Sequence, residues 1–136
     1  MIRLRFTYQP TFQNRVIRLF TWYEYTHVEL EALPGMYIGA VPGKGVALHS
    51  TQVTKEKFML LDVDHTIVLK YIQAELGKKY DLWGAIGIGL RHDIGKKDRW
   101  FCSELLGEAI NAAKPTFSIP SYKLTPRDIA LVCRDE

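Results

Sequence analysis

Apolar and polar residues alternate along two stretches near the start of the chain, a period of two that is typical of half-buried strands. In residues 2–7, Ile, Leu and Phe alternate with Arg and Thr, which predicts a first strand that ends near Pro10. In residues 26–33, His27 and Glu29 fall on a polar face, and the positions between them are apolar. This second strand is therefore predicted to have one buried face and one polar face.

Turn signals follow the second strand and divide the next 20 residues into short strands. Pro34-Gly35 predicts a tight turn before a strand over 36–41, and the glycine-rich 42–45 predicts another before a strand over 46–50. The three strands from 26 to 50 then form an antiparallel meander. A further strand is predicted over 57–63.

Helical spacing of apolar residues is clearest over 102–113, where Leu105, Leu106, Ala109 and Ile110 define one face. Other helices are predicted from residue 11 or 14 to 21–23, over 65–76, over 81–87, and after a cap at 125–128 near the C-terminus. The stretch 91–99 is predicted to be a loop. Strands and helices together predict an α+β domain with an antiparallel sheet packed against helices.

Length and composition fit a single domain over residues 1–136, because 47% of the residues are hydrophobic. The formal net charge is +3, and its 18 basic residues are scattered, so nucleic-acid binding is not indicated. No apolar run reaches bilayer length and no signal-peptide pattern begins the chain. With two cysteines, which can form at most one disulfide, the chain is predicted to be a cytoplasmic protein.

Cys102 is the first candidate for chemistry, because the predicted helix places its thiol at or just before the first turn. Unpaired N–H groups and the positive end of the helix dipole favour a thiolate there and offer donors to an oxyanion. A buried thiol with no chemical role is the competing interpretation. A nucleophilic cysteine also needs a base, usually a histidine that the fold brings near.

The residue spacing gives weaker support to the other candidate sites. Asp62, Asp64 and His65 lie together, but neighbours on a strand point to opposite faces, so a strand-end turn is favoured over a metal site. The glycines of residues 84–89 lack the setting of a phosphate loop and are explained by close packing. Cys133 is interpreted as an unreactive thiol. No metal or cofactor is predicted.

Three short motifs carry a resemblance to a known family. They are Tyr25-Thr26-His27-Val28-Glu29-Leu30, Gly77-Lys78-Lys79-Tyr80-Asp81 and Trp100-Phe101-Cys102-Ser103-Glu104-Leu105. In this order they resemble the circularly permuted branch of NlpC-type papain-fold hydrolases, in which the histidine strand precedes the cysteine helix. The chain is similar to the YiiX-like proteins, including small bacteriophage and bacterial members, and more distantly to the lecithin retinol acyltransferase group.

The resemblance implies a papain-like fold and a cysteine peptidase or amidase, with Cys102 as nucleophile and His27 as its base. Tyr80 matches the family's Tyr-Asp motif and, with Trp100 and Ser103 beside the nucleophile, is expected to bind substrate. Packing is an equal explanation for Tyr80. The expected substrate is a peptide or another amide, with an ester as the alternative.

The third member of the catalytic group departs from the family pattern. Relatives carry a polar residue on the strand beside the histidine, whereas residues 39–43 of this chain include no carboxylate, amide or imidazole. Glu29 shares a strand face with His27 and ranks first as a replacement, against a solvated surface role. His49 is one strand further away, and a Cys-His dyad is also viable. Two alternative functions therefore remain, a catalytically inactive binding or accessory protein and a lipid acyltransferase.

Overall fold

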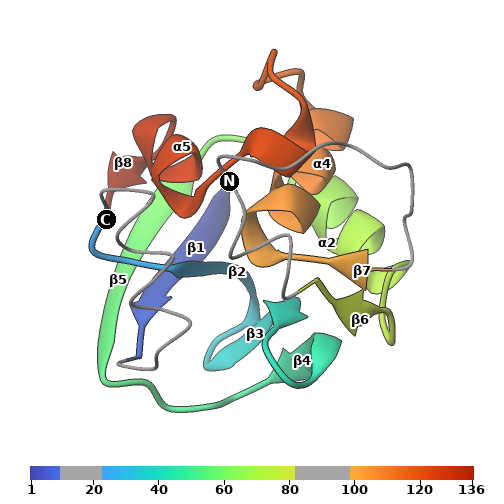
Figure 1. The fold of residues 1–136 in the computed structure, drawn as a ribbon. Helices are drawn as coiled ribbons and strands as arrows, with labels where there is room; N and C mark the ends of the chain where they lie inside the picture. Colours follow the sequence, from blue (N-terminus) through green and yellow to red (C-terminus); the bar gives the residue numbers. More distant parts are fainter. Residues whose placement is uncertain (10–22, 82–98) are drawn as a thin grey trace.

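The computed structural model describes residues 1–9, 23–81 and 99–136, and these form a mixed α+β structure (Figure 1). A six-stranded sheet in the order β4-β3-β2-β1-β5-β8 has antiparallel neighbours throughout. Its strands are β1 (Ile2–Tyr8), β2 (His27–Leu33), β3 (Met36–Val41), β4 (Gly45–His49), β5 (Lys55–Leu61) and β8 (Arg134–Asp135). The predicted meander is confirmed as β2, β3 and β4.

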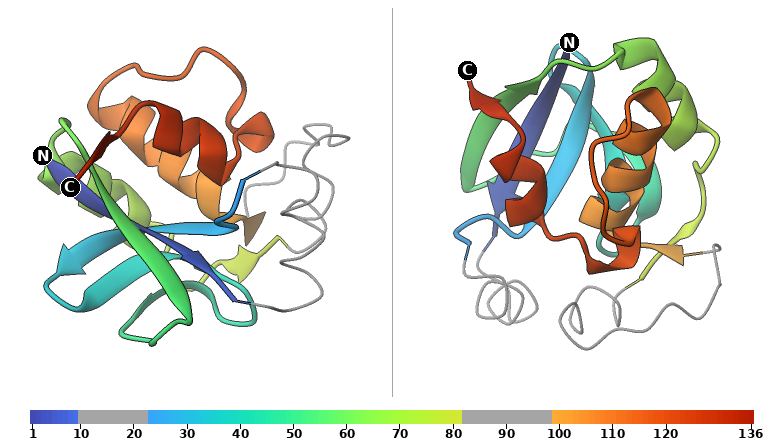
Figure 2. Two further views of the ribbon diagram at one scale, coloured as in Figure 1. Left: turned by 90° about the vertical axis from the view of Figure 1, so that its left-hand side faces the viewer. Right: turned by 90° about the horizontal axis from the view of Figure 1, so that it is seen from above.

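Helices pack on this sheet around one hydrophobic core. They are α2 (His65–Gln73), α4 (Cys102–Ala113), α5 (Pro126–Leu131) and the 3-10 turn η1 (Ser121–Lys123). Figure 2 shows α4 and α5 lying over one face of the sheet. Leu105, Leu106 and Ile110 of α4 join Val28 and Leu30 of β2 in a single buried cluster, as the helical spacing predicted.

The first strand differs from its prediction, because both of its faces are buried. β1 lies inside the sheet between β2 and β5, and its polar residues Arg5 and Thr7 are only 2% and 3% exposed. Arg5 lies directly opposite Glu29 on β2. The polar face of the meander is therefore a buried polar layer.

Several boundaries also differ from the sequence expectations. The fifth strand begins two residues early, at Lys55, and α2 ends at Gln73 instead of residue 76. Asp64 accepts hydrogen bonds from the backbone N–H groups of Thr66 and Ile67, so it caps α2 at the start predicted for that helix. The cap that begins the last helix is confirmed as a capping box between Thr125 and Asp128.

Two short pairings were not predicted. β8 adds to the edge of β5 after the last helix, and β6 (Lys79–Tyr80) pairs in parallel with β7 (Arg99–Trp100). Arg99 thus lies on a strand and not in a loop. The helices predicted over 11–23 and 81–87 and the rest of the 91–99 loop fall outside the described residues. Within the described parts, no helix is long and apolar enough to span a membrane.

Candidate functional site

Cys102 is the first residue of α4, as the pattern of the sequence predicted. Phe101 is the N-cap residue, in an extended conformation and without a side-chain cap bond, so the first-turn N–H groups have no capping side chain. The thiol is 4% exposed, and its Sγ lies 3.8 Å from the carbonyl oxygen of Thr26, to which it donates. That contact joins the start of α4 to the residue immediately before His27.

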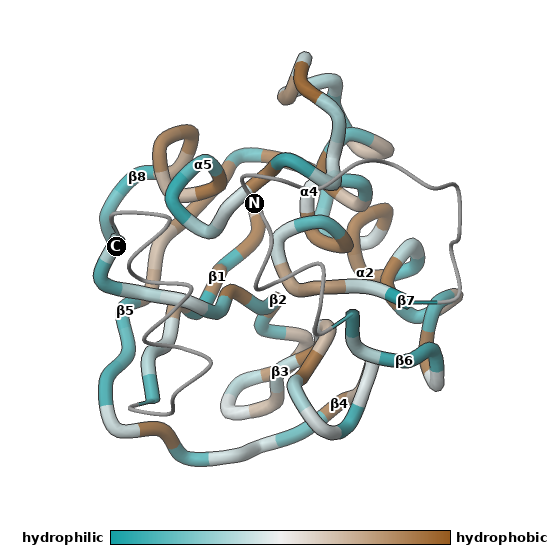
Figure 3. The backbone as a smooth tube through the Cα atoms, in the orientation of Figure 1, coloured by the Kyte–Doolittle hydropathy of each residue, from teal (hydrophilic) through white to brown (hydrophobic). Residues whose placement is uncertain are grey.

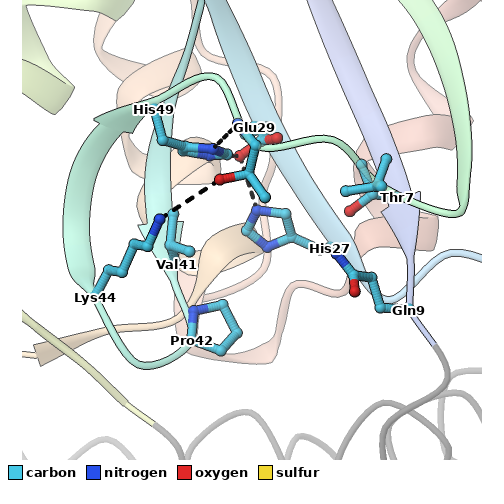
Figure 4. A pocket seen from close by; sticks show the side chains of 10 residues that line it. Thr7, Gln9, His27, Glu29, Val41, Pro42, Lys44 and His49 are labelled. Carbon is cyan, nitrogen blue, oxygen red and sulfur yellow. Dashed lines mark hydrogen bonds and ion pairs between the residues drawn. The ribbon is translucent and has the colours of Figure 1, made fainter.

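His27 is the first residue of β2, and Glu29 lies two residues further along the same face. Oε2 of Glu29 is 3.0 Å from Nε2 of His27, while the carboxylate is only 1% exposed (Figure 4). Period-two geometry of the strand places both side chains on one side of the sheet. The structure therefore gives His27 a carboxylate partner from its own strand, and the solvated role for Glu29 is excluded.

His49 approaches the same carboxylate oxygen from β4, and its hydrogen bonds assign the proton on each imidazole. Nδ1 of His49 accepts from the backbone N–H of Thr51 at 3.2 Å, so Nε2 must carry the hydrogen that it donates to Glu29 at 2.6 Å. A carboxylate only accepts, so Nε2 of His27 donates as well. The side chain of His27 is left with Nδ1 for other chemistry, and that atom has no hydrogen-bond partner within the described residues.

Arg5 balances the buried charge of Glu29 from the neighbouring strand β1. One guanidinium nitrogen lies 3.3 Å from Oε1 of Glu29, and others contact Glu56 at 2.7 Å and the carbonyl of Thr51 at 2.9 Å. The ring of Tyr37 lies under the guanidinium, 4.1 Å away. Buried charges are tolerated when they are paired and hydrogen-bonded, and each guanidinium nitrogen of Arg5 has such a partner.

A glycine on β3 leaves room for the carboxylate to reach across to β4. A side chain at Gly39 would place its Cβ 3.2 Å from the Cβ of Glu29, closer than side chains usually pack. Leu30 lies opposite Ile38, so this ladder sets Gly39 beside Glu29. The absence of a side chain at Gly39 thus leaves room for Glu29, which contacts His49 on the next strand.

The pKa of His27 is raised and the pKa of Glu29 is lowered, because the charge of each residue outweighs the effect of burial on the other. Burial lowers the pKa of His27, but the charge of Glu29, the nearby Cys102 thiol and the hydrogen bond to Glu29 outweigh it and raise the pKa to about 10. Burial raises the pKa of Glu29, but the charge and hydrogen bond of His27, with a contribution from His49, lower it to about 2. At neutral pH the pair is therefore an imidazolium and a carboxylate.

The three residues predicted to bind substrate have varied surroundings. Trp100 is 2% exposed, and its indole N–H lies 3.4 Å from the partly buried carboxylate of Glu75. Ser103 is fully buried, and its hydroxyl donates to the carbonyl of Leu124 at 2.7 Å. Tyr80 is half-buried at a surface hollow. Contacts within the core account for Trp100 and Ser103, and a substrate role for all three stays a prediction.

A cavity of about 350 Å³ opens beside the two histidines, and we call it the His27 cavity. Figure 4 shows His27 and His49 at one side of it, with Lys44 and Pro42 from the β3–β4 turn at another. Thr7, Gln9 and Val41 also line it. A largely apolar cavity with a few convergent polar groups is the usual form of a small-molecule site.

Arg5 is the site residue that the sequence reasoning missed. Its position on the polar face of the first strand could have indicated its role, because that strand pairs with the strand of Glu29. Within the described residues no group of three or more His, Cys, Asp or Glu side chains is arranged to hold a metal ion.

No protein-family model matches this chain, and neither the curated proteins nor the solved structures include a significant match to it.

Proposed function

We propose that this protein is a thiol hydrolase that forms an acyl-enzyme at Cys102, with the permuted NlpC-type, papain-like architecture that its motifs resemble. The observation that carries the proposal is the position of His27 between the Cys102 helix and Glu29. One imidazole nitrogen is held by a buried carboxylate 3.0 Å away, the other has no hydrogen-bond partner in the described part of the chain, and the Cys102 thiol lies close enough to contribute to the raised pKa of the ring. A nucleophile, its base and an orienting group are the parts that covalent catalysis needs.

The first half of the reaction forms the thioester. The thiolate of Cys102, whose proton is held on Nδ1 of His27, attacks the substrate carbonyl carbon, and the C=O electron pair moves onto oxygen. His27 then transfers its Nδ1 proton to the leaving amine or alkoxide as the carbon–heteroatom bond breaks. The products are the acyl-thioester of Cys102, a neutral His27 and the released amine or alcohol.

The second half restores the enzyme. Neutral His27 removes a proton from water, the resulting hydroxide attacks the thioester carbonyl, and the C–S bond breaks to return the thiolate. The acyl group leaves as a carboxylic acid, and His27 again carries the proton. An alcohol in place of water would yield an ester by the same steps, which is how acyl transfer to a lipid would proceed.

The start of α4 stabilises the charge that develops on the substrate oxygen. The first N–H groups of a helix have no partner inside the helix, and no side chain caps those of α4. Donors of this kind lower the barrier most when they are fixed before the reaction begins. Burial of the Leu105, Leu106 and Ile110 face holds this helix end in place.

The Glu29 geometry favours an enzyme over an inactive binding module. Residues 39–43 at the end of the strand beside His27 include no carboxylate, amide or imidazole, and Glu29 supplies a carboxylate from β2 instead. A partner that is buried, charge-balanced by Arg5 and held by His49 fits an orienting role. Amide or peptide hydrolysis is the leading reaction, with ester hydrolysis as its close alternative.

The direct test is capture of the acyl-enzyme. The full chain is mixed with p-nitrophenyl acetate at pH 7, and p-nitrophenolate release is followed while intact mass and peptide mapping locate any acetyl group. We expect a burst of p-nitrophenolate and an acetyl thioester on Cys102 that is absent in Cys102→Ala. Replacing His27 with Ala should abolish the burst, whereas replacing the remote His65, which lies on α2, should leave it intact. Acetylation that is equal in the His27 variant would overturn the proposal.

A further inference from the structure

A second hollow, of about 340 Å³, lies on the other side of the β3–β4 turn from the His27 cavity. Four basic residues line it, and we call it the basic hollow. They are Lys44, Lys78, Lys79 and Arg99. The two spaces share Pro42 and Lys44, so they are neighbours along one surface. Figure 3 colours β6 as hydrophilic, and both residues of β6 line the hollow.

The basic residues come from separate parts of the chain and are brought together by backbone contacts. The N–H of Val46 donates to the carbonyl of Lys78 at 2.8 Å, and the N–H of Gly77 donates back to Val46 at 3.0 Å. Lys79 lies opposite Arg99 in the parallel pair of β6 and β7. The fold thus fixes the backbones of these residues at one place, although their side chains reach into solvent.

A close approach of two backbones forms the floor of the hollow. Gly45 has a φ of 80°, and a Cβ at this residue would lie 2.2 Å from the carbonyl oxygen of Lys78. A side chain is therefore excluded from this position on steric grounds. Gly43 and Gly77 also line the hollow, so peptide backbone is exposed between its basic side chains, Pro42 and Tyr80.

The positive charge of the hollow is largely uncompensated within the described structure. Lys78 forms an ion pair with Glu75, but no carboxylate is among the described lining residues, and neither Lys79 nor Arg99 forms an ion pair with a described residue. Lys44 has a long hydrogen bond of 3.5 Å to the Thr51 hydroxyl. Like charges gathered around a concave surface repel one another and attract an anion.

The basic hollow is close to the proposed nucleophile. Arg99 and Cys102 are three positions apart in the chain, so their Cα atoms lie within about 11 Å of each other even if the segment is fully extended. Lys44 also lines the cavity beside His27. The distance from the hollow to Cys102 is therefore within the length of a ligand of moderate size.

We propose that the basic hollow binds an anionic group, a carboxylate or a phosphate, of the same substrate whose acyl carbon reacts at Cys102. This inference rests on the proposed function, because it defines the substrate class of that site. Lys79 and Arg99 give the main attraction, and Lys44 joins them at the border of the two spaces. Substrates with a neutral end lack this interaction and react more slowly.

The test uses alkylating probes of graded length. The iodoacetyl derivatives of glycine, 4-aminobutyrate and 6-aminohexanoate, each compared with its primary amide, carry the anion at increasing distances from the reacting carbon. A 6-aminohexyl phosphate derivative separates a phosphate preference from a carboxylate preference. We expect the longest anionic probe to alkylate Cys102 about tenfold faster than its amide at low salt, because several exposed charge pairs of modest strength act together.

Charge variants decide whether the hollow is responsible. The advantage of the long anionic probe should fall severalfold in Lys79→Gln and Arg99→Gln, and it should shrink in 0.5 M salt, a condition chosen to screen charges over roughly 4 Å. Lys114→Gln removes the same charge at the far end of α4, about 18 Å from Cys102, and should leave the advantage unchanged.

The two proposals fail in different ways. Amide probes that react with Cys102 independently of His27 would contradict the proposed function. His27-dependent reaction of the amide probes, with no anionic advantage or with equal losses in Lys79→Gln and Lys114→Gln, would overturn the basic hollow and leave the thiol hydrolase intact. As a check on binding itself, inorganic phosphate should shift the backbone NMR signals of Gly43 and Lys79 in the Cys102→Ala chain, and no shift there would also overturn it.

Discussion

Oε2 of Glu29 accepts hydrogen bonds from His27 at 3.0 Å and from His49 at 2.6 Å, so one buried oxygen holds imidazoles from two strands. Because the backbone of Thr51 fixes the proton of His49 on Nε2, the carboxylate also fixes the proton of His27 on Nε2. This relationship leaves Nδ1 of His27 outside the contact with the carboxylate, and it is the atom that the proposed mechanism pairs with Cys102.

Glu29→Gln should lower the pKa of His27 from about 10 toward its ordinary value near 6.5. The amide keeps the shape and accepts hydrogen bonds, but it lacks the charge that stabilises the imidazolium. Nitrogen-15 NMR titration of His27 measures the change directly. An unchanged pKa would show that Glu29 does not control the ring.

The His27–Glu29 pair should also make stability depend on pH. His27 has its pKa raised by the fold, so its contribution is complete below the unfolded value near 6.5 and is lost as pH rises toward 10. Glu29 has its pKa lowered, so its contribution is complete above about 4.5 and is lost as pH falls toward 2.

Urea unfolding across pH measures this dependence. We expect the free energy of unfolding of the wild type to fall by at least about 1 kcal/mol between pH 6.5 and 10 relative to His27→Gln. The comparison with the variant removes the contribution of groups elsewhere in the chain. Parallel curves for the two proteins would contradict the shifted pKa.

His49 is expected to act as a positioning residue for Glu29. His49→Leu removes a donor from a buried carboxylate and should cost about 2 kcal/mol in the free energy of unfolding. Gln can place a donor near the former Nε2 position, so His49→Gln should recover at least half of the loss. Denaturant curves check the stability, and equal losses in the two variants would argue against the hydrogen bond.

The two thiols should differ sharply in reactivity. Burial raises the pKa of Cys133 to about 12, and its Sγ donates to the carbonyl of Ile129 at 3.2 Å, so it stays protonated at neutral pH. One equivalent of iodoacetamide at pH 7 should therefore label Cys102 at least about tenfold more than Cys133, because the thiolate is the reactive form. Peptide mapping gives the ratio, and preferential labelling of Cys133 would contradict the assignment.

The sequence predicted the elements that carry His27 and Cys102, because strand alternation and helical spacing are strong local signals over residues 26–33 and 102–113. It also predicted Glu29 as the first choice of partner, since residues two apart on a strand share a face. The buried state of Glu29 was not predictable from local pattern. It depends on Arg5 and His49, which only the order and register of three strands bring to the same carboxylate.

The shortest strands were missed for a related reason. β6, β7 and β8 contain two residues each, too few to show any periodicity. Their pairings arise from the packing of longer elements around them. The basic hollow was not predictable from the sequence for the same reason. Its residues Lys44, Lys79 and Arg99 are far apart in the chain, where basic residues look scattered.

The pH dependence of Cys102 alkylation by iodoacetamide tests the central claim most directly. The rate is measured from pH 4.5 to 9 in the wild type, in His27→Ala and in the matched variant His65→Ala, with labelling at Cys102 confirmed by peptide mapping. We predict that the wild type and His65→Ala keep most of their rate at pH 6, and that His27→Ala loses at least about tenfold there, because it lacks the imidazolium that holds the thiolate. Equal profiles for the wild type and His27→Ala would contradict a Cys102–His27 pair.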